Sequence, residues 1–134
     1  MGTIAVDSSA LLAMLLHEPD ADAISQITMR ADRKIISAVT YMETGIVWDN
    51  QATDPPTEPE KLDQLLGTLN IEVIAVDQSM AQAARRAYRR FGKGNHAARL
   101  NLGDCFAYAL AKSCDAPLLF KGDDFAKTDI AVAF

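Results

Sequence analysis

Several features that would direct a protein to a membrane or divide it into domains are missing from this sequence. No apolar run approaches the roughly 18 to 20 residues that a membrane-spanning helix needs. The first residues lack the basic region and long apolar stretch of a secretory signal. There is no internal repeat, low-complexity tract or second domain boundary in the 134 residues. We therefore expect one domain, residues 1–134, in a cytoplasmic protein that does not associate with a membrane.

Cysteine is almost absent, and the two cysteines present cannot pair with each other. Cys105 and Cys114 fall in one predicted helix, where nine residues separate their Cα atoms by about 13 Å. A disulfide requires Cα atoms within roughly 7 Å of each other. We expect both to be small buried apolar residues in a reducing compartment.

Positive charge is scarce overall but concentrated in one segment. The net charge is −5, which by itself disfavours a nucleic-acid-binding protein. Residues 85–99, however, hold nearly half of the basic residues and no acid at all. The average therefore hides a basic patch on an acidic body. The basic residues of this segment are Arg85, Arg86, Arg89, Arg90, Lys93 and Arg99.

Short apolar runs alternate with helical patterns along the chain. The predicted strands are Thr3–Val6, Lys34–Ser37, Ile71–Val76, Pro117–Phe120 and a weak final strand, Ile130–Val132. The predicted helices are one capped by Ser8 or Ser9, one around Ile24, one capped by Thr40, and the segments Lys61–Leu69, Ser79–Phe91 and Leu102–Ser113. Three prolines make residues 53–59 a loop. This alternation predicts a three-layer α/β/α domain around a mostly parallel sheet of four to five strands.

Acidic residues follow several of the predicted strands. Asp7 comes directly after the first strand, Asp77 after the third, and Asp123 and Asp124 after the fourth. Ligands of an open parallel sheet bind beyond the carboxyl ends of its strands, so these positions are candidates for a site. A single aspartate there is more often a helix cap or turn residue. The sequence Asp77-Gln-Ser fits a cap well, and we assign Asp77 no functional role.

Two further acids lie in apolar surroundings. Glu43 falls within the otherwise apolar stretch Val39–Trp48, and Asp104 opens a helix that is apolar nearly all round. Asp104 could simply be a first-turn acid that the helix dipole stabilises. Buried carboxylates that gather together repel one another unless a cation neutralises them. Because no cluster of histidine or cysteine accompanies these acids, an ion bound there would be Mg²⁺ or Mn²⁺ rather than zinc.

Two other classes of phosphoryl-handling protein share parts of this pattern. A response-regulator receiver would use Asp77 and Lys121, but it needs a pair of acids after the first strand, where Asp7 is followed by Ser8. A haloacid-dehalogenase-type phosphatase would use Asp123 and Asp124, but it needs Asp-x-Asp after the first strand, and position 9 is serine. Neither class accounts for Glu43 and Asp104.

Four segments together resemble the PIN-domain ribonucleases, specifically the VapC-type toxins of bacterial toxin–antitoxin pairs. Each segment is modestly specific alone, but their order and the near-complete coverage of the chain make the resemblance specific. The segments are Ile4–Leu11, Ser37–Glu43, Leu102–Leu110, and Leu118–Phe125 followed by Thr128–Ile130.

The resemblance implies a metal-dependent endoribonuclease. It assigns Asp7, Glu43 and Asp104 as core acids, with Asp7 and Asp104 contacting Mg²⁺ or Mn²⁺ directly. Glu43 would help to position the ion or the attacking water. The fourth acid is Asp123 or Asp124, of which we prefer Asp124. Ser8 or Ser9 would supply a supporting hydroxyl beside the metal.

The resemblance also implies partners. The expected substrate is RNA, the expected protein partner is a cognate VapB-type antitoxin, and the expected assembly is a homodimer. The basic segment could guide the RNA backbone toward the acidic centre. It could equally be a solvated helix face or contact the antitoxin. A PIN-like module that binds RNA or protein without catalysis remains the alternative at this stage.

Overall fold

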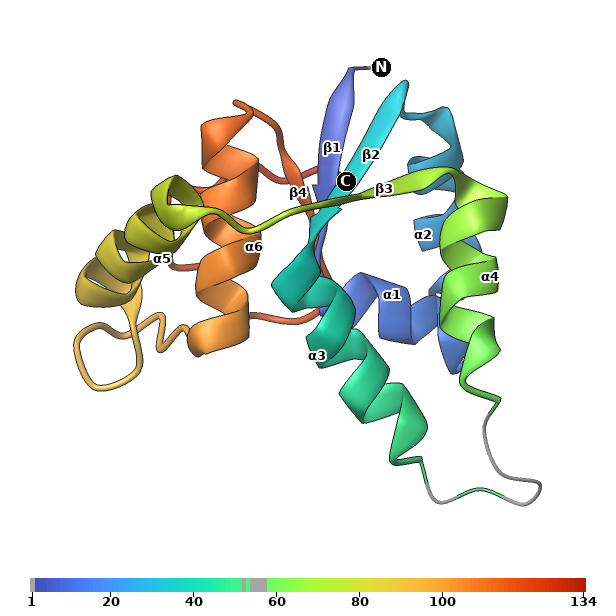
Figure 1. Cartoon of the computed structure of the whole chain (residues 1–134). Coiled ribbons are helices and arrows are strands. Elements are labelled where there is room, and N and C mark those ends of the chain that lie inside the picture. Colours follow the sequence, from blue (N-terminus) through green and yellow to red (C-terminus); the bar gives the residue numbers. More distant parts are fainter. Residues whose placement is uncertain (1, 52, 54–57) are drawn as a thin grey trace.

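A four-stranded parallel sheet forms the centre of the computed structural model, which describes residues 2–51, 53 and 58–134 (Figure 1). The strands stand in the order β3-β2-β1-β4. They are β1 (Thr3–Val6), β2 (Arg33–Ser37), β3 (Ile71–Ile74) and β4 (Leu118–Leu119). The helices are α1 (Ser8–Leu15), α2 (Ala21–Arg30), α3 (Ala38–Asp49), α4 (Glu60–Leu69), α5 (Gln78–Phe91) and α6 (Leu102–Ser113).

Alternate side chains of the central strand feed two separate cores. In β1, Ile4 and Val6 pack with α1 to α4, whereas Ala5 packs with α5 and α6. This two-residue period is the one that a pleated strand imposes. Figure 1 shows the result, with α5 and α6 on one side of the sheet and α1 to α4 on the other. The predicted three-layer α/β/α architecture with a parallel sheet is confirmed.

Two strands, β3 and β4, are shorter than the sequence predicted, and the reason lies in their partners. The predicted strand Ile71–Val76 ends at Ile74, because β3 pairs only with β2 and Ser37, the last residue of β2, lies opposite Ile74. Pro117–Phe120 reduces to Leu118–Leu119, which pair with Ala5 and Val6. The predicted final strand Ile130–Val132 was wrong, since only one isolated bridge joins Val132 to Leu118.

Two helices begin earlier than the sequence predicted. Asp7, rather than Ser8 or Ser9, caps α1, and its carboxylate accepts from the Ser9 backbone N–H. Ser37, rather than Thr40, caps α3 and accepts from the Thr40 N–H. In both cases the last residue of a strand region doubles as the helix cap. Asp77 caps α5 through the Met80 N–H, as predicted. Of the predicted proline loop, residues 54–57 lie outside the described residues.

The order of the strands places the topological switch point of the sheet beside β1. The chain builds β1, β2 and β3 in one direction and then crosses to add β4 on the other side of β1. Helices switch faces at this point, so the carboxyl ends of β1 and β4 border the position where open α/β sheets bind ligands. Asp7 and the turn 121–124 both lie at this edge.

The two cysteines differ in burial. Cys105 and Cys114 are both free, as predicted, but Cys105 is buried and Cys114 is exposed at the end of α6. The expectation of two buried cysteines was therefore wrong for Cys114. Within the described residues, no helix has the length and apolarity that crossing a membrane would take.

Candidate active site

Asp7 is a buried carboxylate with two roles at the end of β1. One oxygen, Oδ2, caps α1 by accepting from the Ser9 N–H at 3.1 Å and from the Ser9 hydroxyl at 2.7 Å. The other oxygen, Oδ1, is buried without a hydrogen-bond partner among the described residues. Burial raises the pKa of Asp7 to about 6; hydrogen bonds from Ser9 oppose that rise, and the nearby Glu43 carboxylate adds to it.

Ser9 connects Asp7 to the segment that follows β4. Its hydroxyl donates to Asp7 and accepts from the Lys121 backbone N–H at 2.9 Å. The Lys121 ammonium turns away from Asp7 and pairs with Glu18 at 3.1 Å and Asp20 at 3.2 Å. Of the two predicted serines, Ser9 is thus the one whose hydroxyl contacts Asp7.

Glu43 reaches the site from α3 by lying across the backbone of α6. A Cβ atom added at Gly103 would overlap the Glu43 carboxylate. Only glycine therefore permits this close approach between α3 and the first turn of α6. Glu43 Oε1 is buried without a hydrogen-bond partner among the described residues. A buried carboxylate oxygen that accepts no hydrogen bond is costly, so Glu43 Oε1 fits a position beside a cation.

Asp104 closes the cluster from the amino end of α6. It forms a capping box with Asn101: the Asp104 N–H donates to Asn101 Oδ1 at 2.8 Å, and the Asn101 N–H donates to Asp104 Oδ2 at 3.1 Å. Burial raises the pKa of Asp104 to about 7, and the charges of Asp7, Asp124 and Glu43 raise it further. The cap alone does not explain Asp104, because a carboxylate that only caps a helix would have no such acidic neighbours.

The candidate fourth acids are both exposed in the turn after β4. The charge of Asp124 acts on Asp104, whereas Asp123 is not among the groups that shift any resolved pKa of the cluster. This electrostatic effect is the reason to prefer Asp124 as the fourth acid, which stays a prediction.

Three elements far apart in sequence thus bring carboxylates to one crevice. The donor set consists of carboxylate and hydroxyl oxygens, which suit Mg²⁺ or Mn²⁺. The two buried oxygen atoms without donors and the mutual repulsion at Asp104 fit a cation bound between the acids. Across the described residues, no three carboxylate, histidine or cysteine side chains already stand in ligating positions. Small side-chain rotations would therefore have to accompany binding of an ion.

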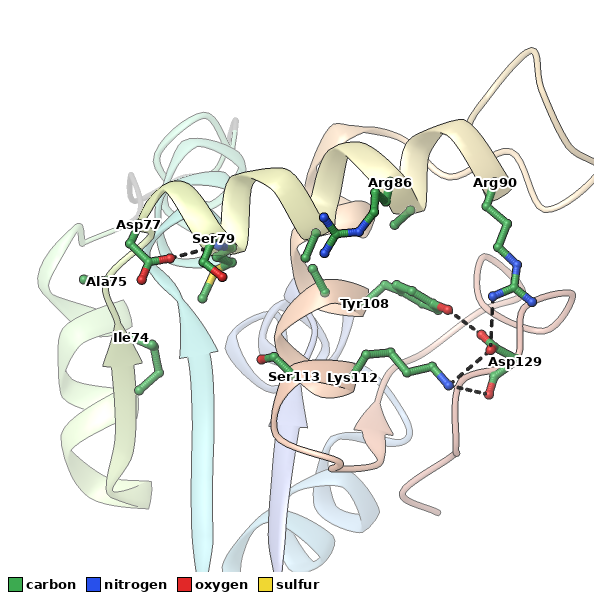
Figure 2. Close-up of a pocket in the computed structure, with 14 residues that line it drawn as sticks. Ile74, Ala75, Asp77, Ser79, Arg86, Arg90, Tyr108, Lys112, Ser113 and Asp129 are labelled. Atoms are coloured by element: carbon green, nitrogen blue, oxygen red, sulfur yellow. Dashed lines mark hydrogen bonds and ion pairs between the residues drawn. The ribbon is translucent and has the colours of Figure 1, made fainter.

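The basic segment divides between two sides of α5. Arg85 and Lys93 line a cavity against the amino-terminal half of α6, whereas Arg86 and Arg90 line another against its carboxyl-terminal half. Figure 2 shows the second cavity, where Arg90, Lys112 and Tyr108 converge on Asp129. Arg90 and Lys112 contact the Asp129 carboxylate at 3.4 and 3.2 Å. Arg89 and Arg99 are exposed.

Three residues of the site were missed from the sequence. Asn101 and Gly103 shape the Asp104 turn, and the backbone of Lys121 holds Ser9. The asparagine could have been found, because Asn-x-x-Asp before an apolar run is a helix-start signal. Gly103 and Lys121 act through contacts with residues 60 and 112 positions away, for which the sequence contains no local signal.

Comparison with known proteins agrees with this geometry. The family model described as PIN domain matches residues 4–131. The chain belongs to the PIN-domain family. The match includes every carboxylate of the cluster and leaves the receiver and phosphatase interpretations without support.

Relatives of this PIN domain include curated ribonucleases. It is 45% identical over 126 residues to "Ribonuclease VapC" of Mycolicibacterium smegmatis, covering 94% of this chain and 96% of that protein. It is 44% identical over 126 residues to "Ribonuclease VapC30" of Mycobacterium tuberculosis, covering 94% and 95%. These relatives confirm the resemblance to VapC-type PIN-domain ribonucleases and support RNA hydrolysis as the activity.

Solved structures share the fold at low sequence identity. The crystal structure of Mycobacterium tuberculosis VapC20, described as a sarcin–ricin loop cleaving toxin, matches with a TM-score of 0.74 and 11% identity over 96% of both chains. A toxin–antitoxin complex from Klebsiella pneumoniae matches with a TM-score of 0.70 and 16% identity over 98% of both chains. At these identities the similarity concerns the fold alone.

Proposed function

We propose that this PIN domain is the toxin of a VapBC-type pair and a metal-dependent endoribonuclease. The observation that carries the proposal is the convergence of Asp7, Glu43 and Asp104 at the switch point of the sheet, with two buried carboxylate oxygens lacking donors. Asp7 and Asp104 would hold Mg²⁺ or Mn²⁺. When bound, such an ion supplies a Lewis acid that activates water and stabilises the charge developing on the phosphate.

The chain's own residues orient the carboxylates for this task. Ser9 and the α1 backbone hold Asp7 Oδ2, whereas Oδ1 accepts no hydrogen bond within the described residues and would serve as the ligand atom. The Asn101 N–H holds one oxygen of Asp104 in the same way. Glu43 retains a free oxygen, Oε1, which can orient an ion or accept a proton from the attacking water. Asp124, rather than Asp123, completes the set.

The proposed partners follow the same reasoning. RNA would approach over the exposed arginines of α5. The similar fold of the toxin–antitoxin complex from Klebsiella pneumoniae supports a cognate antitoxin for this chain. A homodimer is supported by exposed apolar side chains on α3 and α6. Met42 is 64% exposed, Ile46 50% and Leu102 66%, and all three line one cavity of about 680 Å³.

Cleavage of end-labelled RNA by protein free of antitoxin tests the activity. We expect cutting in Mg²⁺ or Mn²⁺ and none in a chelator. Asp7→Asn and Asp104→Asn remove charge while nearly preserving shape, and each should lower the rate at least about 100-fold. Arg30→Ala, at the exposed end of α2, is the control. Folded, metal-loaded protein that leaves all RNA intact would instead indicate a PIN domain that binds without catalysis.

A further inference from the structure

A groove between α5 and α6 lies next to Asp104, because the Asn101 cap of Asp104 is one of its lining residues. Its volume of about 550 Å³ is in the range of small-ligand sites. One wall comprises Arg85, Tyr88 and Lys93, and the other comprises Asn101, Leu102 and Phe106. Apolar and aromatic surface therefore forms the interior, with cationic side chains at the border.

The groove and the acidic cluster share a residue. Asn101 lines the groove and also forms the two capping hydrogen bonds with Asp104. Leu102, which follows it, lines both this groove and the cavity that contains Glu43. A ligand in the groove would thus lie directly beside the reacting centre.

Tyr88 presents a fixed aromatic ring to this groove. Its hydroxyl donates to the Lys93 carbonyl at 3.1 Å, and the ring lies so close to Gly92 that a Cβ there would overlap it. Asn95 Nδ2 further donates to the Tyr88 carbonyl at 3.2 Å. The side chain is nevertheless 40% exposed. A ring that is already immobile loses little entropy when another flat group stacks on it.

The positive charge at the border is not neutralised locally. Arg85 and Lys93 form no ion pair within the part of the chain that the structure describes, and no acid lines the groove. Lys93 also lines a second cavity of about 550 Å³ together with His96 and Arg99, again without an acid. Lys93 is thus shared by two cavities whose linings hold no acid. On the other side of α5, by contrast, Arg90 and Lys112 both form an ion pair with Asp129 (Figure 2).

We propose that this groove binds an unpaired nucleotide of the RNA substrate, with its base stacked on Tyr88 and Phe106 and its phosphate facing Lys93 and Arg85. The inference rests on the proposed ribonuclease function. Unstacked bases are commonly held between aromatic side chains, with arginine or lysine at the backbone. A base within a Watson–Crick pair cannot stack on these two rings, so the subsite would take an unpaired nucleotide.

Binding of RNA without cleavage tests the subsite. The inactive Asp7→Asn protein, at full length and in a chelator, is titrated into a fluorescein-labelled unstructured RNA and followed by anisotropy. In this background, Tyr88→Ala or Phe106→Ala should weaken binding roughly 5- to 150-fold, the loss typical of one stacked base. Tyr88→Phe keeps the stacking ring and loses only one of the contacts that hold it, so it should retain most of the parent's affinity. Lys93→Ala should weaken binding at low salt and reduce the slope of affinity against salt concentration.

Two exposed residues at the end of α2 provide matched controls, because α2 and α5 lie on opposite sides of the molecule (Figure 1). Met29→Ala and Arg30→Ala should leave RNA affinity unchanged. Ultraviolet crosslinking of 4-thiouridine RNA to the Asp7→Asn protein gives a readout that needs no groove variant. Adducts on the peptides that carry Tyr88 or Phe106 are expected, and adducts found elsewhere only would overturn the proposal.

Active protein separates this inference from the proposed function. If the wild type cuts RNA and Tyr88→Ala and Phe106→Ala bind and cut equally well, the groove is not a base subsite and the ribonuclease remains. The same result accompanied by weakened antitoxin binding would assign the groove to the protein partner and overturn the proposal. If the wild type cuts no RNA, the proposed function fails, whatever the groove variants do in the binding assay.

Discussion

At the scale of single residues, Gly103 sets how near Glu43 comes to the other acids. Alanine has a higher helix propensity than glycine by about 1 kcal/mol, so Gly→Ala within a helix normally stabilises a protein. At Gly103 the new methyl group would displace the Glu43 carboxylate. We expect Gly103→Ala to weaken Mn²⁺ binding about 10-fold or more in calorimetric titration, and to forgo the usual gain in stability.

The chain offers a matched control for this substitution. Gly67 lies in α4 with nothing within 4 Å of an added Cβ, so Gly67→Ala should stabilise the protein and leave Mn²⁺ affinity unchanged. In a Glu43→Ala background, Gly103→Ala has no carboxylate to displace and should behave like Gly67→Ala. Additive effects of the Glu43 and Gly103 substitutions would contradict the proposed contact.

The raised pKa values of Asp7 and Asp104 predict how stability depends on pH. Both carboxyl groups hold protons more tightly in the folded protein, near pH 6 and 7, than in the unfolded chain, near 3.8. Their stabilising contribution is therefore complete below about pH 4 and is lost as pH rises through 6 to 7. For metal-free protein we expect the melting temperature to fall between pH 4.5 and 8.

Asp104→Asn isolates one of these contributions. The variant cannot lose a proton at that position, so its melting temperature should rise relative to the wild type by roughly 3 °C or more as pH increases to 8. Mn²⁺ should restore stability to the wild type at pH 8, because a bound ion favours the charged carboxylates. If the melting temperatures of the two proteins instead changed with pH in the same way, folding would not raise the pKa of Asp104.

At the scale of elements, Asp129 fastens the carboxyl-terminal segment to α5 and α6. It accepts from the Tyr108 hydroxyl, and its carboxylate also contacts Arg90 and Lys112 (Figure 2). The hydrogen bond from Tyr108 lowers the pKa of Asp129, as do the two cations. Exposed ion pairs contribute little, so the half-buried hydroxyl contact should matter most.

Tyr108→Phe tests whether the hydroxyl contact with Asp129 stabilises the protein more than the exposed ion pairs do. It removes the hydroxyl and leaves the ring that packs on Phe91. We expect a loss of about 1–2 kcal/mol in urea unfolding, against a few tenths for Lys112→Ala, which removes one exposed partner. If Lys112→Ala lowered the free energy of unfolding more than Tyr108→Phe, the ion pair would be the more stabilising contact.

The elements themselves were largely predictable from the sequence, and the exceptions share one cause. The strands Thr3–Val6 and Lys34–Ser37 and the amphipathic helices follow from local periodicity. The end of β3 at Ile74 does not, because it depends on where the partner strand stops. Likewise, Asp7 and Asp104 were found because they stand at element boundaries. Gly103 and the Lys121 backbone were not, because their roles arise only when α3 meets α6 and β4 meets α1.

At the scale of the whole molecule, the apolar side chains on α3 and α6 predict self-association. Met42→Glu should convert the proposed homodimer to a monomer in size-exclusion chromatography with light scattering, because it places a charge in the apolar interface. Met29 on α2 is nearly as exposed, at 60% against 64%, and Met29→Glu should leave the dimer intact. A wild type that is monomeric at all concentrations tested would remove this proposal.

The pairing of β1 with β4 has a consequence for folding of the chain during its synthesis. Ala5 lies against Leu118, and the carboxylates at positions 7, 43 and 104 meet only when α6 is in place. A nascent chain that has not yet emerged through β4 can form no complete crevice. The nuclease site is therefore complete only after residue 119, the last residue of β4, has been synthesised.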